Sequence, residues 1–429
     1  MKILLTGATG FIGDTVLREL LQQGHHIIAC CRKPEKVLIE SENLRPLRLD
    51  FAAADNLEKW LPHLDDIDAV INCVGIIAES KDGTFTQLHT QAPIALFKAC
   101  EQAGIKKIIQ ISALGADGQA QSAYHLSKKA ADDALRQLPL DWFILQSSLV
   151  YGDRAQSSAL LHALAALPVQ ILPDGGLQQL QPIHVDDVAA AICRCLEPST
   201  PARKTLALVG PTPIAYADLL QKLRRRLGKP AAVTVTLAQR YLLILAGLGK
   251  YLDEPILSKD TITMLSRGNA AAADNVTELL GRPPLSIQAQ LFEKPASQAE
   301  RRSAQLYFAK PVLRFAIAFV WLWSGITSLF FYSHELSYQL LAATGISGSA
   351  APIMLYGLAL IDIALGLATL SPYRPARLMS WQIGIVLVYT LVVSFTLPEF
   401  WLHPFGPLLK NIPFLLCLWI YKQLAGEKS

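Results

Sequence analysis

Length and composition set the first limits on what this chain can be. At 429 residues it is long enough for two or three domains. Its apolar fraction of 52% lies slightly above the soluble range of about 45–50%. The net charge of +4 is too small to indicate nucleic-acid binding, and the basic residues form no patch interleaved with aromatic residues. We therefore expect no nucleic acid among the partners.

Cysteine spacing and the N-terminus indicate the compartment. No two cysteines form a CxxC pair, and no His/Cys cluster has metal-ligand spacing, so we expect no metal site. The cysteines are then small buried apolar residues in a reducing compartment. The first ten residues, "MKILLTGATG", contain too short an apolar run for a signal peptide, which predicts a cytoplasmic N-terminal domain.

The first thirty residues have the pattern of a strand, a glycine turn and a helix. Residues 3–5 are apolar, "TGATGFIG" follows, and residues 11–21 repeat apolar side chains at helical spacing. Glycines in such a turn let backbone amides approach a pyrophosphate at the helix N-terminus. A glycine turn without a ligand is the alternative. The residues expected to bind a dinucleotide here are Gly7, Gly10, Phe11, Ile12 and Gly13.

The end of the second predicted strand, residues 26–30, indicates which dinucleotide binds. An NAD site usually places an acid after this strand, about 20 residues beyond the glycines, to hold the ribose hydroxyls. Here Arg32 and Lys33 follow, with no acid before Glu35. Because cations suit a 2′-phosphate, we expect NADP, with NAD as the alternative. Both side chains could instead simply face solvent.

Further strands and helices alternate along the chain. Residues 47–49 lead to Asp50 and Phe51, residues 69–74 to Gly75, and residues 107–111 to Ser112. A helix from about 122 to 138 precedes a strand at 142–145. This alternation predicts an α/β fold with a doubly wound parallel sheet, whose ligands bind at the carboxyl ends of the strands.

Tyr124 and Lys128 form a Y-x-x-x-K pair on the predicted helix. Positions i and i+4 lie on one helix face, so the ammonium can approach the phenol. A neighbouring cation stabilises phenolate and lowers a tyrosine pKa from about 10. The pair thus predicts that Tyr124 acts as a general acid or base.

Residues 1 to about 290 resemble the short-chain dehydrogenase/reductase superfamily in its extended or atypical branch. The nearest likeness is to the group that includes the NAD(P)H-binding accessory subunit of respiratory complex I. The matching stretches, in family order, are "TGATGFIG", "CRKPEK", "RLDF", "INCVG", "ISALGAD", "YHLSKKAADDAL", "LVYGD" and "QPIHVDDVAAAI".

This resemblance implies a role for each matched position. The glycines would hold the pyrophosphate, and Arg32 the adenosine phosphate. Asp50 and Phe51 would flank the adenine, and Gly75 the cofactor ribose. Ser112, Tyr124 and Lys128 would form the catalytic triad, with Lys128 also reaching the nicotinamide ribose.

Two departures from the family pattern bear on catalysis. The helix asparagine that completes a proton relay has no counterpart in "LHTQAPIALFKAC", where Thr90 or Gln91 stands near its place. An Arg-Pro pair often follows the sixth strand, and here residues 146–148 are Gln-Ser-Ser. The branch also includes NADPH-binding proteins without known catalysis. The resemblance thus supports cofactor binding more strongly than reduction.

Three features of the middle region have competing interpretations. Acids after His184, at Asp186 and Asp187, are typical of a helix start, although they also invite a catalytic role. The basic run at 222–229 is expected to be a solvated helix face, with contact to anionic lipid as the alternative. The apolar stretch 237–252 is too short to span a bilayer, so it predicts a buried core helix or one lying on a membrane surface.

Four apolar stretches beyond residue 310 each suit a membrane helix: about 311–332, 350–371, 376–397 and 405–424. The loops 333–349 and 398–404 contain neither Lys nor Arg. By the positive-inside rule we expect a multi-pass protein of the inner membrane with both termini cytoplasmic. The basic residues that indicate this are Arg301, Arg302, Lys310, Arg314, Arg374, Arg377, Lys422 and Lys428.

The membrane half resembles the DoxX-like family over about residues 311–424, most clearly in "HPFGPLLKNIPFLLCLW". This resemblance implies redox chemistry at the membrane. Asp362 falls near the middle of the second stretch, and Lys410 lies about one turn into the fourth. Charges at such depth usually face the bundle interior. We expect Asp362 to be paired or functional, whereas Lys410 is either inside or directed to the surface.

Together these features predict a Rossmann core at residues 1–150, a substrate-binding region at 151–295, a basic linker at 296–310 and a four-helix transmembrane domain at 311–429. The leading hypothesis is a membrane-anchored NADP-dependent oxidoreductase. Its partners would be membrane lipid and a small hydrophobic substrate, such as a quinone or a lipid-like carbonyl. The alternative is a non-catalytic NADPH-binding protein for redox sensing or assembly. A transporter regulated by its soluble half is least favoured, because the helices carry few buried charges.

Overall fold

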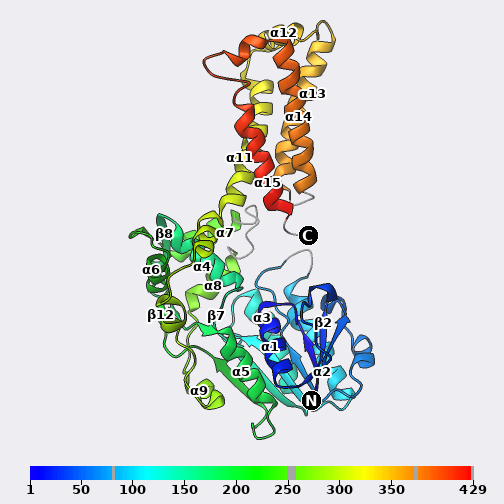
Figure 1. The fold of residues 1–429 in the computed structure, drawn as a ribbon, viewed down its shortest axis with the longest axis vertical. Coiled ribbons are helices and arrows are strands. Elements are labelled where there is room, and N and C mark those ends of the chain that lie inside the picture. Colours follow the sequence, from blue (N-terminus) through cyan, green and yellow to red (C-terminus); the bar gives the residue numbers. More distant parts are fainter. Residues whose placement is uncertain (80–82, 249–257, 372–374, 427–429) are drawn as a thin grey trace. The chain divides into compact units, whose positions relative to one another are not determined.

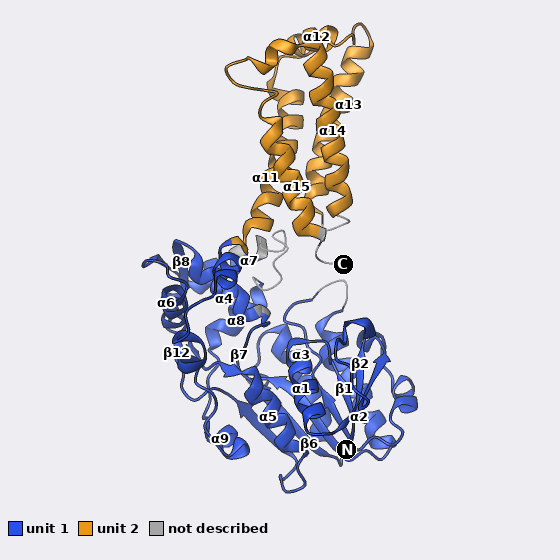
Figure 2. Cartoon of the chain, in the orientation of Figure 1, with its two compact units in different colours: residues 1–250, 254–305 blue, residues 251–253, 306–429 orange. Residues whose placement is uncertain are grey.

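The computed structural model describes residues 1–79, 83–248, 258–371 and 375–426 (Figure 1). The chain divides into two compact units, residues 1–250 with 254–305 and residues 251–253 with 306–429 (Figure 2). The first unit combines a sheet with helices, and the second is helical. The finer boundary expected at residue 150 stays a prediction.

A parallel sheet forms the centre of the first unit. Among the described residues it has seven strands, in the order β11-β6-β5-β4-β1-β2-β3, and every pairing is parallel. This confirms the predicted doubly wound α/β fold. The strands are β1 (Lys2–Thr6), β2 (His26–Cys31), β3 (Leu44–Arg48), β4 (Ala69–Asn72), β5 (Lys107–Ala113), β6 (Asp141–Ser147) and β11 (Lys204–Leu208).

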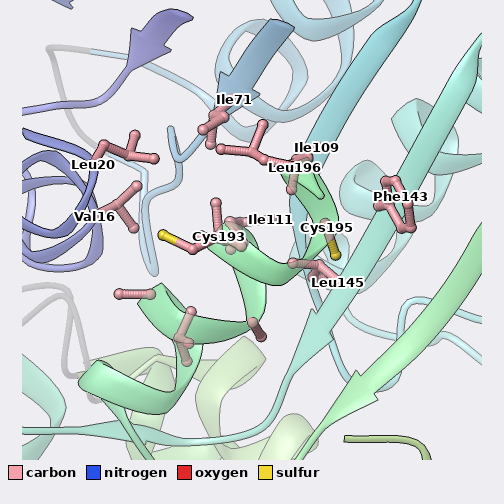
Figure 3. Packing of buried hydrophobic residues seen from close by; sticks show 14 of the residues in the cluster. Val16, Leu20, Ile71, Ile109, Ile111, Phe143, Leu145, Cys193, Cys195 and Leu196 are labelled. Atoms are coloured by element: carbon pink, nitrogen blue, oxygen red, sulfur yellow. The ribbon is translucent and has the colours of Figure 1, made fainter. Parts of the chain in front are cut away.

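Helices cover both faces of this sheet. Ile3 and Leu5 point to one face and Leu4 to the other, as the period of two in a strand requires. The first face packs on α1 (Phe11–Gln22), α5 (Val185–Leu196) and α9 (Asp274–Leu280), and Figure 3 shows this packing around Val16, Leu20 and Cys193. The second face packs on α2 (Ala92–Gln102) and α3 (Ala123–Arg136). Burial on both faces explains the continuous apolar runs of these strands.

A smaller region of the first unit follows β6. Its short strands pair as β7 (Val150–Tyr151) with β10 (Ile183–His184), β9 (Gln179–Leu180) with β12 (Ile214–Ala215), and β8 (Val169–Pro173) with β13 (Val233–Leu237). Its helices are α4 (Gln156–Ala166), α6 (Tyr216–Arg226), α7 (Gln239–Leu248), α8 (Lys259–Arg267) and α10 (Gln298–Leu306). The last of these occupies most of the segment expected to be a basic linker.

The basic run on α6 is not simply a solvated face, so that expectation was wrong in part. Arg224 is buried and donates to the carbonyl oxygens of Ala165 (2.8 Å) and Leu167 (2.6 Å). The guanidinium of Arg226 is also covered and pairs with Glu300 at 2.7 Å. Arginine side chains can satisfy several backbone acceptors at once, and spacing along a helix does not reveal such distant partners. These two arginines therefore hold α4 and α10 against α6.

The start of α5 confirms the structural interpretation of its acids. The His184 ring accepts a hydrogen bond from the Asp186 backbone N–H at 3.3 Å, as an N-cap does. Asp187 is completely buried and accepts from Arg282 and from the Leu285 N–H, both at 2.6 Å. This carboxylate links α5 to the segment after α9.

Helix α7 is not the buried core helix that was one of the two expectations for residues 237–252. Tyr241 is 47% exposed and Ile244 is 68% exposed. The Arg240 guanidinium lies over the Tyr241 ring, 4.8 Å from its centroid. Residues 249–252 of that prediction lie outside the described part. Leu242 and Leu243 are half-buried and Ala246 is buried, so α7 has both a covered and an exposed side.

The second unit consists of helices: α11 (Ala309–Ile326), α12 (His334–Ala343), α13 (Ala350–Leu370), α14 (Pro375–Thr396) and α15 (Asn411–Gly426). Within the described residues three helical segments are long and apolar enough to cross a membrane: 298–331, which joins α10, α11 and the turn after it, then α13 and α14. Their outward side chains include Ile353, 75% exposed, and Phe395, 85% exposed. Apolar residues on the outside are typical of helices that face lipid.

Several polar groups in this unit are buried and bonded across helices. The buried Arg314 on α11 donates to the Thr369 carbonyl at 2.9 Å and to the Leu370 carbonyl, which caps the end of α13. Asp362 is 8% exposed and accepts from the Ser324 hydroxyl at 2.8 Å. The expected pairing therefore holds for one carboxylate oxygen, whereas Oδ1 is buried with no partner among the described residues.

The fourth predicted membrane stretch begins later than expected. Pro404, Gly406 and Pro407 break the helical pattern, since proline lacks an N–H and Gly406 has φ +52°. Helix α15 starts at Asn411 and has 16 residues, about 24 Å at 1.5 Å per residue, against a hydrocarbon core of about 30 Å. Lys410 is exposed and precedes α15, so its predicted place inside a helix was wrong.

Candidate NAD(P) site and catalytic residues

The turn after β1 has the geometry of a dinucleotide cradle. Gly7 has φ +73°, which favours glycine, and a Cβ there would lie 3.0 Å from the Cys73 carbonyl. A Cβ on Gly13 would lie 2.1 Å from the Gly7 carbonyl oxygen, so helix α1 can approach the turn only with glycine at this position. Gly10 is the N-cap of α1, and its backbone conformation is extended. Phe11 and Ile12 begin the helix. These residues fit a pyrophosphate held by backbone amides.

The neighbouring strand ends bring the adenosine-side candidates to the same edge. Arg32 and Lys33 directly follow β2 and are exposed. Asp50 follows β3 and is exposed, and its carboxylate accepts from the Ala52 N–H at 3.2 Å. Because β1, β2 and β3 are adjacent and parallel, their carboxyl ends form one continuous rim. The sequence prediction that these residues gather is therefore consistent with the fold, whereas their roles stay predictions.

Phe51 differs from its expected place. Its side chain is 6% exposed and packs edge-to-face on Trp60, with ring centroids 5.5 Å apart. The ring is part of the hydrophobic core, so only the Phe51 backbone remains to meet an adenine.

Lys128 and Gly75 meet at the centre of the same edge. The Lys128 ammonium donates to the carbonyl oxygen of Val74 (3.1 Å), just beyond β4, and to that of Ile111 (3.2 Å), near the end of β5. A Cβ on Gly75 would lie 3.1 Å from Nζ, so glycine leaves room for the ammonium. Burial lowers the pKa of Lys128 to about 8, although the nearby Asp132 carboxylate opposes the shift.

Tyr124, one helical turn before Lys128, is surrounded by three other aromatic rings. It meets His89, His125 and Phe85 edge-to-face, with centroid distances of 5.3, 5.4 and 5.8 Å. Burial raises the pKa of Tyr124 to about 12, and the charge of Asp132 adds to the shift. The expected lowering of this pKa was therefore wrong for the protein alone, because desolvation of the phenol and the charge of Asp132 both raise it. Tyr124 keeps its proton at neutral pH.

Ser112 lies below the site. Its side chain is 2% exposed, and its hydroxyl donates to Asp132 at 2.5 Å. In this arrangement Ser112 positions Asp132 behind Lys128 and does not face a substrate. Its assignment to the catalytic triad stays a prediction that the geometry does not favour.

His89 is a site residue that sequence reasoning missed. It belongs to a π-helical turn, Thr86–Gln91, ahead of α2. Its Nε2 accepts from the Ile76 N–H, and Nδ1 lies against the Ser127 hydroxyl, both at 3.0 Å. Ser127 in turn donates to the Tyr124 carbonyl at 2.8 Å. The imidazole thus stands at the place where the family's asparagine was sought, whereas Thr90 bonds to the Ser127 carbonyl.

Both nitrogens of His89 are engaged, and this fixes its protonation state. Since Nε2 accepts a hydrogen bond from a backbone N–H, the ring is neutral with its proton on Nδ1. Burial and the Lys128 charge lower the pKa of His89 to about 2. His89 therefore orients Tyr124 and is not a proton carrier. A π-turn is often found at functional sites, but no residue pattern in this stretch reveals it.

Two family profiles match separate parts of the chain. Residues 7–198 match the profile of an NAD(P)H-binding family, and residues 318–419 match that of the DoxX-like family. The chain joins an NAD(P)H-binding domain to a DoxX-like membrane domain. The expected cofactor class and the fusion to a membrane domain are thereby confirmed, whereas the preference for NADP over NAD is a separate question.

Relatives of the chain include a subunit of a larger oxidoreductase and a reductase. The 40 kDa subunit of NADH-ubiquinone oxidoreductase from Neurospora crassa is 24% identical over 60% of this chain and 68% of the relative. The 2'-dehydrokanamycin reductase of Streptomyces kanamyceticus is 25% identical over 54% of this chain and 68% of the relative.

A solved structure shares the fold of the first unit. The Escherichia coli NADPH-dependent quinone oxidoreductase QOR2 with NADPH superposes with a TM-score of 0.55 and 20% identity. The match covers 67% of this chain and 97% of that protein. At this identity the likeness supports the Rossmann-like fold alone.

Proposed function

We propose that the protein is a membrane-anchored NADP-dependent oxidoreductase that reduces a carbonyl or quinone dissolved in the membrane. The observation that carries the proposal is the meeting of Tyr124 and Lys128 with the glycine cradle at one edge of the sheet, in a chain that continues into apolar helices. The relatives support an NAD(P)H-binding oxidoreductase fold and leave the substrate open.

Tyr124 supplies the proton in this proposal. A bound nicotinamide cofactor would supply the hydride to the substrate carbon. The substrate oxygen gains negative charge in that step, and a phenol that is protonated at neutral pH can donate to it. The ring contacts with His89 and Phe85 hold the phenol in one orientation. Lys128 then stabilises the phenolate that remains.

The preference for NADP rests on Arg32 and Lys33. Both are exposed at the carboxyl end of β2, where a 2′-phosphate would lie. The first acid after them, Glu35, accepts from Arg48 at 3.2 Å. Cations therefore lie where the adenosine ribose would bind, and no acid directly follows β2.

The membrane half gives the protein its location. Its outward apolar side chains make lipid a direct partner, and a substrate that dissolves in lipid would be concentrated there. We propose the inner membrane, with both termini cytoplasmic, on the distribution of basic residues. One loop departs from this distribution, because residues 397–410, which connect α14 to α15, include Lys410.

A second function has specific support. The Ser112 hydroxyl is committed to Asp132, and His89 is not a proton carrier, so two parts of the usual catalytic machinery are missing. A protein that binds NADPH as a redox gauge or assembly signal needs neither. This alternative predicts NADPH affinity without turnover.

The test uses the purified full chain in lipid nanodiscs. NADPH would be added with each member of a panel of quinones and lipid aldehydes, and the loss of reduced-cofactor absorbance followed. The proposal predicts saturable oxidation by at least one member. Tight NADPH binding with no oxidation by any of them would favour the binding protein.

A further inference from the structure

Helix α3 carries two successive Lys–Asp pairs at positions i and i+4, in the run "KKAADD". Lys129 and Asp133 form the outer pair, an ion pair whose side chains are 32% and 46% exposed. Lys128 and Asp132 form the inner pair, at 3% and 0% exposed. Side chains at this spacing lie on one helix face. Asp132 is therefore a buried acid next to the candidate cofactor site, and the proposed chemistry does not use it.

Both members of the inner pair are held near the end of β5. The Lys128 ammonium donates to the Ile111 carbonyl at 3.2 Å. Asp132 accepts from the hydroxyl of the next strand residue, Ser112, at 2.5 Å. Since consecutive residues of one strand hold them, the ammonium and the carboxylate are neighbours. A second bond, to the Val74 carbonyl, uses another of the three ammonium N–H groups and leaves one for a ligand.

The charges of this pair depend on each other. Burial lowers the pKa of Lys128 to about 8, and the Asp132 charge opposes this shift. Burial raises the pKa of Asp132 to about 6, and the Ser112 hydrogen bond and the Lys128 charge oppose that shift in turn. Arg136 also acts on Asp132 from the next turn of α3, but its guanidinium pairs with Asp133 at 2.6 Å. Both members of the inner pair are therefore charged between about pH 6 and 8.

The other titratable groups around the pair do not change charge in this range. They are Tyr124 on α3, Cys73 directly after β4, and His89 on the π-helical turn. Burial raises the pKa values of the phenol and the thiol to about 12 each, and lowers that of the imidazole to about 2. Within the described part of the chain, Asp132 is thus the group that supplies negative charge to Lys128 at neutral pH.

We propose that Asp132, held by Ser112, is a positioning residue that keeps the Lys128 ammonium charged and available to the cofactor. A buried ammonium loses its proton more readily than one in water, and a fixed carboxylate one helical turn away counteracts this. Ser112 then acts on cofactor binding through Asp132, in place of the substrate contact that the family resemblance implies. The inference rests on the proposed function for the contact between Lys128 and the cofactor, and it needs no turnover.

The pH profile of NADPH affinity tests the proposal. Asp132→Asn keeps the shape of the side chain, and its amide oxygen can still accept from Ser112. Calorimetry on the full chain in nanodiscs would compare this variant with the unmodified protein from about pH 5.5 to about pH 9.5, since affinity follows the protonation of Lys128. We expect the pH at which affinity falls to move down by about one unit, the lower end of the effect of a nearby opposite charge.

The size of the difference should itself depend on pH. Near neutral pH the variant should bind NADPH roughly two- to fivefold more weakly, as expected when a charged donor is replaced by a neutral one. Below about pH 6 the two affinities should agree, because Asp132 is itself protonated there. The cofactor phosphates titrate alike in both measurements and cancel in the comparison. A merely structural role of Asp132 predicts instead an equal loss at every pH.

Two further variants separate the effect of this charge from other causes. Asp133→Asn removes the same charge from the outer pair, at the next position of α3, and should leave the profile unchanged. Ser112→Ala removes the donor to Asp132 and so destabilises its carboxylate. The profile should then move in the same direction as in Asp132→Asn, by a smaller amount. A role of Ser112 at the substrate alone predicts no change in cofactor affinity at any pH.

The outcomes distinguish this inference from the proposed function. A shifted profile without NADPH oxidation by any tested substrate would support the role of Asp132 and count against the reductase. NADPH oxidation with an unshifted profile in Asp132→Asn would support the reductase and overturn the inference. Equal shifts in Asp132→Asn and Asp133→Asn, or a loss that is uniform with pH, would overturn it as well. If Asp132→Asn binds no NADPH, the profile of Ser112→Ala decides: a downward shift supports the inference and an unchanged profile overturns it.

Discussion

At the scale of single residues, the site depends on how burial shifts the pKa values of Tyr124 and Lys128 in opposite directions. Desolvation raises the pKa of the phenol to about 12 and lowers that of the ammonium to about 8. The lysine is therefore the group of this pair that titrates near neutral pH. This arrangement suits a tyrosine that donates a proton, because the phenol stays protonated until a substrate oxygen accepts from it.

The Lys128 pKa predicts how NADPH affinity depends on pH. Its ordinary pKa of 10.5 is lowered to about 8, so the free protein loses this charge as pH rises through about 8. A bound cofactor favours the charged form, and affinity should therefore fall above that pH. We expect a loss of roughly fivefold, since a hydrogen bond from a charged donor is worth about 1 kcal/mol more than one from a neutral donor. Calorimetry between pH 7 and 9.5 or so would measure it. Lys128→Met should bind more weakly with a flat profile, and a pH dependence that survives this substitution contradicts the assignment.

Arg32 is predicted to determine the preference for NADPH over NADH. Removal of its cation should weaken NADPH binding by about tenfold or more, as expected for a charged hydrogen bond of 1.5–3 kcal/mol, while NADH binding stays unchanged. Arg45→Ala is the matched control, because Arg45 is an exposed arginine near the amino end of β3, away from the rim. Dissociation constants for both cofactors settle the point. An unmodified protein that prefers NADH, or equal losses in both variants, would refute it.

At the scale of elements, α7 and the paired strands β8 and β13 present an apolar surface. Val169 pairs with Val233 and Ile171 with Val235, and all four side chains are 44–65% exposed. The Arg240 side chain over the Tyr241 ring is an arrangement common at membrane interfaces, where an apolar body carries a polar tip. Since this unit is joined directly to membrane helices, we expect lipid to cover the surface.

A fluorophore on this surface would test the contact. Ile244→Cys, labelled with an environment-sensitive dye, should be quenched by spin-labelled lipid in vesicles of phosphatidylcholine and phosphatidylglycerol. Leu38→Cys is the control, because Leu38 is 86% exposed in the segment between β2 and β3, far along the chain from α7. Equal quenching at the two positions argues against a specific lipid contact. Concentration-dependent self-quenching at Ile244→Cys would instead indicate a second copy of the chain.

The sequence predicts those elements whose signals are local. Glycines at 7, 10 and 13 mark the turn, and apolar runs mark the buried strands to within two or three residues of their observed ends. Other features depend on partners far along the chain. Arg226 meets Glu300, and His89 meets Ile76 and Ser127, contacts that no spacing rule contains. The pKa of Tyr124 was mispredicted for the same reason, because burial is a property of the whole fold.

At the scale of the whole molecule, the topology in the membrane stays a prediction that labelling can decide. Arg374 lies outside the described residues, so Arg377, exposed at the start of α14, is the better site. Arg377→Cys should react with a membrane-impermeant maleimide only from the cytoplasmic side. Ser347→Cys, in the loop before α13, should react only from the opposite side. The native cysteines are buried or half-buried, which limits background labelling. The reversed pattern would overturn the orientation.

We propose that this chain transfers hydride from NADPH to a substrate in the membrane with Tyr124 as proton donor. The most direct measurement is single-turnover oxidation of bound NADPH in nanodiscs, with a substrate identified by the panel. Tyr124→Phe keeps the ring contacts and removes the hydroxyl, so NADPH affinity should persist while the rate falls by at least about 100-fold. Tyr216→Phe is the control, since Tyr216 is a buried tyrosine of α6 outside the site. A Tyr124→Phe rate close to that of the unmodified protein would contradict the account.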